Sequence, residues 1–519
     1  MNPGKDVGPL ASTGAFSVVA AADENPPSAP VIVAGGRREL REVGWRELAE
    51  RSALWAADLL SRTHIDGRSS ADSAWQPSTG IPVLATPGLG TLVAACACLE
   101  AGWPFVPVHA RWTAAEAASW SRRMTGLGHP LELPAESDLP PDPAVTGFPE
   151  PRRASSPEEI AAVLPTSGSS GEPKGVELSR RALSASARAC AARLGWREED
   201  RWLLTLPLAH VGGFSILTRC LEARRTVVLP PPETAPGFRP AEVLRWVEEA
   251  RVTLLSLVPT MLYRLLELGQ PPPAYLRAVL VGGAAAPPEL MAAARARGWP
   301  VLATYGLTEA CSQVATEDPR ELGSAAQPAG RGREASGVGR LLDGMEARLA
   351  RGRPGEGGVL ELRGPMLFSG YRTGPSQRVP GVGSEGWLTT GDLARLDDDG
   401  GLHILGRRDQ VIVSGGENVH PIEVEQALER HPAVAAAGVL GRPDDEWGEV
   451  VMAVLDAHPS AARPLPTIGE LRTFLEPHLA SYKRPRHLLW TDELPHTATG
   501  KLDRRALRRL LERTERPDS

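Results

Sequence analysis

Short apolar runs alternate with stretches of helical periodicity along the first half of the chain. Runs typical of buried strands occupy 81–85, 104–108, 160–164, 202–206, 224–229, 254–258 and 278–281. Apolar residues at helical spacing lie between several of them, at 43–61, 90–102, 179–194 and 259–266. Strands that alternate with helices form parallel sheets covered on both faces. This pattern therefore predicts a doubly wound α/β fold.

The second half of the chain has a different pattern. A strand at 359–362 and a hairpin around the acidic turn Asp397–Gly401 predict a β-rich portion. The pattern breaks at Gly406–Gln410, and a short α/β pattern then restarts, with helices at 421–430, 468–475 and 504–512 and strands at 434–440 and 450–455. We predict a large N-terminal domain over residues 1–405 and a small C-terminal domain over 406–519. Residues 1–30, rich in Gly, Pro, Ala and Ser, are expected to be a loosely packed lead-in.

Composition narrows the class of protein. The chain has 519 residues, a formal net charge of −6 and five cysteines. This charge gives no reason to expect nucleic acid or an acidic membrane as a partner, and the odd cysteine count favours a reducing compartment. Cys96 and Cys98 lie in an apolar run without further metal ligands nearby, so we interpret them as core residues. We expect a cytoplasmic enzyme, with a homodimer as one possible assembly.

The segment Leu164–Gly175, with the sequence LPTSGSSGEPKG, predicts a phosphate site between two strands. Its small residues allow backbone N–H groups to surround an anion, and Lys174 adds a positive charge. The segment is not a Walker loop, because its Lys is preceded by Pro173 and followed by glycine. Only four of the 57 basic residues are lysines, namely Lys5, Lys174, Lys483 and Lys501, so a lysine that is present has a better chance of a specific role.

This segment resembles the phosphate-binding signature of the adenylate-forming superfamily, and further motifs of the family follow in family order from about Val43 to Lys501. The resemblance implies a reaction in two halves. A carboxylate first attacks the α-phosphorus of ATP to give an acyl-adenylate, and the thiol of CoA then replaces AMP. It also implies Mg²⁺ as the metal. Phosphate contacts are implied for Thr166, Ser167, Gly168, Ser169, Ser170, Gly171 and Lys174.

The resemblance also implies residues for the rest of the nucleotide. Glu309 of the TYGLTE motif matches the metal-coordinating glutamate, with the Thr166 hydroxyl near the same metal. Asp392 of TTGD matches the ribose-binding carboxylate, with Arg407 as its partner. The adenine would lie between Tyr305 on one side and Gly283, Ala284 and Ala285 on the other, and Gly306 and Thr308 are further ATP-binding residues.

The resemblance also implies that the small domain moves and that it carries functional residues. Lys501 of PHTATGK matches the catalytic lysine, and Asp409 falls at the hinge about which this mobile domain swings between two orientations. A CoA-facing loop is implied for Ser414, Gly415, Gly416 and Glu417.

The acid substrate is predicted from the first domain. The amino-acid-activating members carry an Asp where this chain has His210, so an amino acid is disfavoured. The stretches PLAHVGGFSIL, SLVPTMLYRLL and TYGLTEACSQVAT are most similar to the o-succinylbenzoate–CoA ligases of menaquinone synthesis. We assign His210 to catalysis and to the acid pocket, together with Gly212, Gly213 and Ser312; Arg219 or Arg264 could meet a second carboxylate. The alternatives are a benzoate-type or medium-chain ligase, and a catalytically silent nucleotide-binding homologue.

Overall fold

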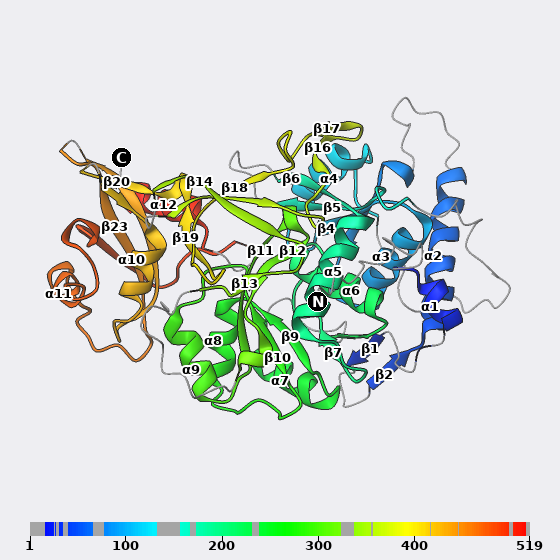
Figure 1. The fold of residues 1–519 in the computed structure, drawn as a ribbon, viewed down its shortest axis with the longest axis horizontal. Helices are drawn as coiled ribbons and strands as arrows, with labels where there is room; N and C mark the ends of the chain where they lie inside the picture. Colours follow the sequence, from blue (N-terminus) through cyan, green and yellow to red (C-terminus); the bar gives the residue numbers. More distant parts are fainter. Residues whose placement is uncertain are drawn as a thin grey trace, which may run out of the picture.

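The structure is a computed structural model of the chain (Figure 1). It describes residues 16–24, 26, 31–34, 40–65, 77–131, 156–166, 173–230, 238–322, 337–353, 357–415, 417–444, 446–497 and 502–514.

The largest sheet has nine strands in the order β13-β12-β11-β10-β9-β7-β8-β1-β2. These strands are β1 (Val31–Ala34), β2 (Leu40–Val43), β7 (Arg201–Leu203), β8 (Thr226–Leu229), β9 (Leu254–Leu257), β10 (Ala278–Val281), β11 (Val301–Leu307), β12 (Ser312–Thr316) and β13 (Arg340–Leu341). The central pairs, from β11 across to β1, are parallel, and the antiparallel pairs lie at the two edges.

Both faces of this sheet are buried. Trp202 and Leu203 are neighbours on β7 but belong to different hydrophobic clusters, because successive side chains point to opposite faces. One face carries α5 (Arg180–Leu194) and α6 (Val211–Ala223), and the other carries α7 (Pro240–Glu249), α8 (Pro259–Glu267) and α9 (Pro288–Ala296). The predicted doubly wound α/β fold is confirmed.

A second sheet has six strands in the order β17-β16-β6-β5-β4-β3. These are β3 (Ile81–Ala85), β4 (Phe105–His109), β5 (Ile160–Thr166), β6 (Lys174–Ser179), β16 (Gly370–Gly374) and β17 (Gln377–Val379). Helices α3 (Leu89–Ala101) and α4 (Ala114–Thr125) pack on this sheet, and α2 (Trp45–Ile65) packs on α3. Strands β5 and β6 pair antiparallel around the predicted phosphate segment, which confirms the strand–loop–strand interpretation.

Three expectations for local structure were wrong. Residues 16–24 are not a loose lead-in, because α1 (Val18–Glu24) buries Val18 and Ala21 and its first N–H donates to Glu100. The strand expected at 202–206 ends at Leu203. Helices α4, α6, α7 and α9 were not predicted.

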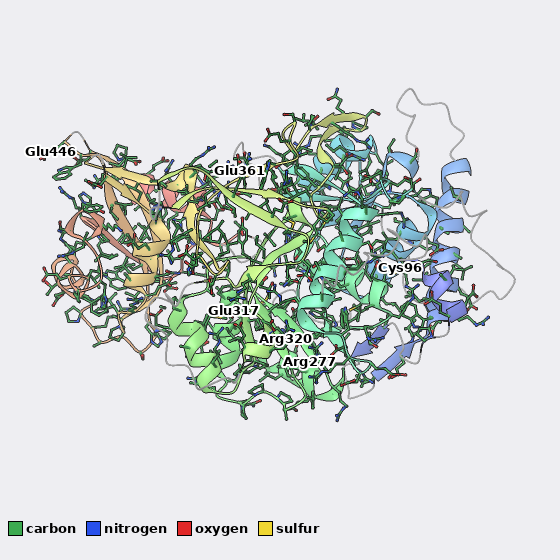
Figure 2. All side chains as sticks on the ribbon, viewed as in Figure 1. Cys96, Arg277, Glu317, Arg320, Glu361 and Glu446 are labelled. Carbon is green, nitrogen blue, oxygen red and sulfur yellow. The ribbon has the colours of Figure 1, made fainter. Side chains whose placement is uncertain are left out.

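The cysteines occupy the core, as expected for Cys96 and Cys98. All five thiols are free and buried, and Cys96 lies on α3 in the N-terminal part (Figure 2). Burial raises the pKa of the Cys96 and Cys98 thiols, so both stay protonated and unreactive.

The β-rich portion is a four-stranded antiparallel sheet in the order β14-β15-β18-β19. Its strands are β14 (Glu346–Arg353), β15 (Gly357–Arg363), β18 (Leu388–Leu396) and β19 (Leu402–Arg407). The pairing of β18 with β19 confirms the hairpin predicted around the acidic turn.

The C-terminal part packs around its own apolar clusters at one end of the molecule (Figure 1). It contains β20 (Ile412–Ser414), β21 (Glu417–Val419), β22 (Val434–Asp444), β23 (Gly448–Ala457) and β24 (His487–Thr491), with α10 (Pro421–Leu428), α11 (Ile468–Phe474) and α12 (Arg504–Thr514). These clusters contain no described residue before Ile412, and the boundary at 405/406 stays a prediction. None of the helices in the described ranges combines the length and apolarity that a bilayer crossing requires.

Candidate active site

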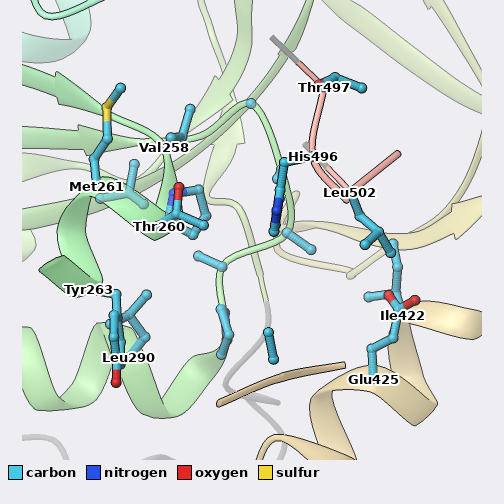
Figure 3. Close-up of a pocket in the computed structure, with 18 of the residues that line it drawn as sticks. Val258, Thr260, Met261, Tyr263, Leu290, Ile422, Glu425, His496, Thr497 and Leu502 are labelled. Atoms are coloured by element: carbon cyan, nitrogen blue, oxygen red, sulfur yellow. The ribbon is translucent and has the colours of Figure 1, made fainter. Parts of the chain in front are cut away.

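A cleft of about 2950 Å³ lies between the large part of the molecule and the C-terminal part. Its lining includes the ends of parallel strands β3, β10 and β11 and of β5, the edge at which open α/β sheets bind ligands. Figure 3 shows side chains on both sides: Val258, Thr260 and Met261 from the large part, and His496, Thr497 and Leu502 from the C-terminal part.

All residues predicted for ATP and its metal that the structure describes line this cleft. They are Thr166, Lys174, Gly283, Ala284, Ala285, Tyr305, Gly306, Thr308, Glu309, Asp392 and Arg407. Ser167, Gly168, Ser169, Ser170 and Gly171 lie outside the described residues. The cleft thus brings together residues that are more than 200 positions apart in the sequence, such as Thr166 and Asp392.

Asp392, the predicted ribose ligand, is held from two sides. Its Oδ2 accepts a 2.5 Å hydrogen bond from the Tyr305 hydroxyl, and its Oδ1 accepts one of 3.1 Å from Arg407 Nη1. Burial, together with the Asp392 charge, raises the pKa of Tyr305, so the phenol stays protonated and acts as the donor. Gly391 adopts a left-handed φ of 80°, which favours glycine before the carboxylate. Asp392 is therefore a fixed acceptor suited to a vicinal diol.

Glu309, the predicted metal ligand, follows β11 at the start of a 3₁₀ turn. Its Oε1 accepts a 2.9 Å hydrogen bond from the Tyr371 hydroxyl, and Oε2 accepts none from the described residues. Within the described ranges no three His, Cys, Asp or Glu side chains come together as a metal site. One free carboxylate oxygen fits Mg²⁺, which binds through one or two carboxylates and substrate phosphates.

The base of the phosphate hairpin is fixed by a buried ion pair. Thr166 and Lys174 face each other in the β5–β6 register, at the two ends of the loop. Further along β6, Glu177 Oε1 accepts a 2.6 Å hydrogen bond from Arg372 Nε, and its Oε2 forms a 2.7 Å ion pair with Arg378 Nε. The side chains of Glu177 and Arg372 are only 1% and 3% exposed, whereas that of Arg378 is 61% exposed. The Arg372 pair therefore anchors the strand that leads out of the phosphate loop.

His210 is the N-cap residue of α6 and lines the cleft. Its ring centroid lies 4.9 Å from that of His109 at the end of β4. His109 Nδ1 accepts from the Arg111 N–H, and burial lowers the pKa of His109, so this second ring is neutral. His109 was missed in the sequence, because nothing in its spacing links it to a residue about 100 positions later.

The other predicted acid-pocket residues do not line the cleft. A Cβ on Gly213 would lie 2.3 Å from the Pro207 carbonyl oxygen, so close packing accounts for that glycine. Ser312 adopts a φ of 98° where β12 begins, with its carbonyl against Gly306. Of the two candidate cations, Arg264 lines the cleft, and Arg219 is buried over the Trp202 ring. The roles of Gly212, Gly213 and Ser312 stay predictions.

In the C-terminal part, the segment that leads to Lys501 faces the cleft. His496, Thr497 and Leu502 line it, and Lys501 itself lies outside the described residues (Figure 3). Asp409 Oδ1 accepts a 3.3 Å bond from Arg407, so the predicted hinge is tied to the ribose site.

The predicted CoA loop occupies a different place. Ser414, Gly415 and Glu417 lie in the β20–β21 hairpin and do not line the cleft, and Gly416 lies outside the described residues. The two parts also touch through a 2.9 Å ion pair between Arg430 and Glu289. This orientation presents the lysine segment, and not the CoA loop, to the cleft.

Glu429 is one of four carboxyls of the cleft with a raised pKa, the others being Glu317, Glu425 and Asp456. Burial raises the pKa of Glu429 to about 8, and the charges of Glu425 and Glu289 act in the same direction, while the Ala437 N–H bond opposes them. Because this value exceeds the ordinary 4.5, the native state gains most stability below pH 4.5 and loses that contribution as pH rises to about 8.

Glu429→Gln should therefore stabilise the protein at high pH, since glutamine keeps the acceptor for Ala437 without the charge. We expect wild type and variant to have equal melting temperatures near pH 4.5, and the variant to melt higher by several degrees at pH 8.5. Glu425 and Glu289, with their partners Arg504 and Arg430, face the same region and stay unchanged in the comparison. A constant difference across this range would contradict the assignment.

The chain is similar to known proteins over much of its length. Residues 121–372 match the family model described as AMP-binding enzyme, and residues 423–501 match that of the AMP-binding enzyme C-terminal domain. A 2-succinylbenzoate–CoA ligase of Bacillus pumilus is 38% identical over 358 residues, which are 67% of this chain and 69% of that protein.

Solved structures agree with this match. The o-succinylbenzoate–CoA synthetase of Bacillus subtilis in complex with its acyl-adenylate intermediate has a TM-score of 0.79 at 29% identity, covering 94% of this chain and 97% of that chain. The same enzyme with ATP and a magnesium ion has a TM-score of 0.78 at 29% identity, covering 95% and 98%.

Proposed function

The chain belongs to the family of AMP-binding enzymes, and from this premise we propose that it is an ATP-dependent acid–CoA ligase. Its reaction converts o-succinylbenzoate to o-succinylbenzoyl-CoA through an acyl-adenylate, in menaquinone biosynthesis. ATP and CoA are the co-substrates, and Mg²⁺ is the metal. The observation that best supports this function is the hydrogen bonding of Asp392 with Tyr305 and Arg407. It lies in the cleft that Glu309 and Lys174 also line.

The first half-reaction brings a carboxylate to a triphosphate, so it depends on positive charge and fixed donors. Asp392 accepts the ribose hydroxyls, and Thr166 and Lys174 hold the phosphates at the ends of the hairpin loop. Glu309 would hold Mg²⁺, which would neutralise charge on the phosphates. Lys501 contacts the acid carboxylate and the α-phosphate, where it stabilises the charge that develops as the carboxylate oxygen bonds to phosphorus and pyrophosphate leaves.

In the second half-reaction the sulfur of CoA bonds to the acyl carbon and AMP leaves with the bond electrons. Ser414, Gly415, Gly416 and Glu417 would face the cleft in this step, which requires rotation of the C-terminal part about Asp409. A cytoplasmic location, a homodimer and the absence of nucleic-acid or membrane partners stay predictions from the sequence.

The identity of the acid is tested with a panel. We expect the purified protein to form CoA thioesters from o-succinylbenzoate at least about tenfold faster, in kcat/KM, than from benzoate, octanoate or amino acids. A tenfold preference corresponds to about 1.4 kcal/mol of differential transition-state binding. Preference for benzoate or octanoate would keep the chemistry and overturn the substrate. Binding of ATP without turnover of any acid would instead indicate the silent homologue.

A further inference from the structure

Tyr371 on β16 contacts both halves of the phosphate and metal site. Its hydroxyl donates the 2.9 Å hydrogen bond to Glu309 Oε1, and the Lys174 ammonium lies 5.3 Å from its ring centroid. The Phe368 ring packs edge-on at 4.8 Å, and the Phe368 N–H donates to the Glu309 carbonyl. Tyr371 thus lies between the residue predicted to bind the metal and the residue predicted to bind the phosphates.

The hydroxyl contact restricts the Glu309 side chain. The Tyr371 hydroxyl is the donor of this bond and the Glu309 carboxylate oxygen is the acceptor. With Oε1 engaged, the carboxylate has one orientation and its Oε2 remains for a metal. Bonds from neutral donors to charged acceptors are stronger than those between neutral groups, so this bond is suited to fix a ligand before the metal arrives.

The ring contact restricts Lys174 in the same way. An ammonium within about 6 Å of an aromatic centroid is attracted by the face of the ring. Lys174 is exposed at the start of β6, where a long flexible side chain would otherwise sample many rotamers. The Tyr371 ring gives it a defined position on the cleft side of the hairpin.

We propose that Tyr371 is a positioning residue that aligns the carboxylate of Glu309 for the metal and the ammonium of Lys174 for the phosphates of the same nucleotide. This inference rests on the proposed function of the cleft as an ATP site, and it concerns nucleotide and metal binding before any acid is present. The hydroxyl orients the carboxylate of Glu309 for the metal, and the ring positions the ammonium of Lys174.

Two substitutions separate these roles. Tyr371→Phe keeps the ring and removes the hydroxyl, and Tyr371→Leu removes both. Tyr275→Phe is the matched control, because its hydroxyl donates to backbone carbonyls of Val247 and Glu248 and Tyr275 does not line the cleft. Binding of ATP is measured by calorimetry with excess Mg²⁺ and with EDTA, and Mn²⁺ bound with ATP is followed by electron paramagnetic resonance.

For Tyr371→Phe we expect about tenfold weaker binding of Mn²⁺ with ATP and unchanged affinity for ATP in EDTA, the size expected for one hydrogen bond to a charged group. For Tyr371→Leu we expect, in addition, a severalfold loss of ATP affinity in EDTA, and Tyr275→Phe should match wild type in both.

A Tyr371→Phe protein that binds Mn²⁺–ATP like wild type would overturn the proposal, and so would an equal loss with and without metal. Melting temperatures show whether each variant is folded, and the phenylalanine variant decides the matter even if the leucine variant is unstable. Failure of o-succinylbenzoate turnover would count against the proposed substrate and leave these binding results unchanged.

Discussion

Lys501→Ala should lower the rate of adenylation by about 10²–10³-fold, while transfer of a supplied acyl group from its adenylate to CoA changes less than about threefold. The magnitude is that of removing one fixed donor from a developing anion. This difference between the two half-reactions follows from the orientation of the C-terminal part. Its residues His496, Thr497 and Leu502, on either side of Lys501, line the cleft that Asp392 and Glu309 also line. ATP–pyrophosphate exchange measures the first half-reaction, and thioester formation from synthetic o-succinylbenzoyl-adenylate measures the second.

Lys483→Ala is the control for this prediction. Lys483 is also a lysine of the C-terminal part, and its ammonium pairs with Glu423 at 2.7 Å. We expect exchange by this variant within about twofold of wild type, because a partly exposed ion pair contributes little. An equal loss of both half-reactions in Lys501→Ala would contradict the role of this lysine in the first step alone.

The second large effect is on stability. Arg372→Met should destabilise the large part by about 3–5 kcal/mol, because it leaves Glu177 buried without its main cation. Arg378→Met removes the exposed partner of the same carboxylate and should cost less than about 1 kcal/mol. Urea unfolding followed by tryptophan fluorescence compares the two variants at the same position in the fold.

The double variant Arg372→Met with Glu177→Met tests the physical reason. Replacing a buried ion pair by apolar side chains of similar volume is often neutral or stabilising, so most of the lost stability should return. If the double variant is as unstable as Arg372→Met, the loss comes from packing or from the bonds of Arg372 to the Met124 and Thr79 carbonyls instead.

Much of the fold could be predicted, because apolar runs and helical periods are local signals. The predicted strand at 278–281 matches β10, and the predicted helix at 179–194 matches α5 to within one residue. Helix α6 was missed because its first turn contains Gly212 and Gly213, which are poor helix formers and conceal the periodicity that follows. Helix α1 was missed because its buried side chains are mostly alanine and valine in a short segment.

The residues of the site also divide into those that the sequence predicts and those that only the structure reveals. Asp392, Glu309 and Lys174 stand in motifs whose residue order is visible in the chain. Tyr371 contacts Glu309, which is 62 positions away, and His109 contacts His210, which is 101 positions away. No spacing in the sequence encodes such contacts. The hydrogen bond from Tyr305 to Asp392 was equally hidden, since the motif implied only a ring against adenine.

The most direct test of the central claim follows both half-reactions in one experiment. The protein is mixed with o-succinylbenzoate, radiolabelled ATP and Mg²⁺ without CoA, quenched at intervals, and then given CoA in a parallel sample. Without CoA, we predict one equivalent of enzyme-bound o-succinylbenzoyl-adenylate and release of pyrophosphate. When CoA is added, we predict conversion of this adenylate to the CoA thioester and AMP in a single turnover. Thioester formation accompanied by ADP, or with no adenylate before CoA is added, would contradict the account.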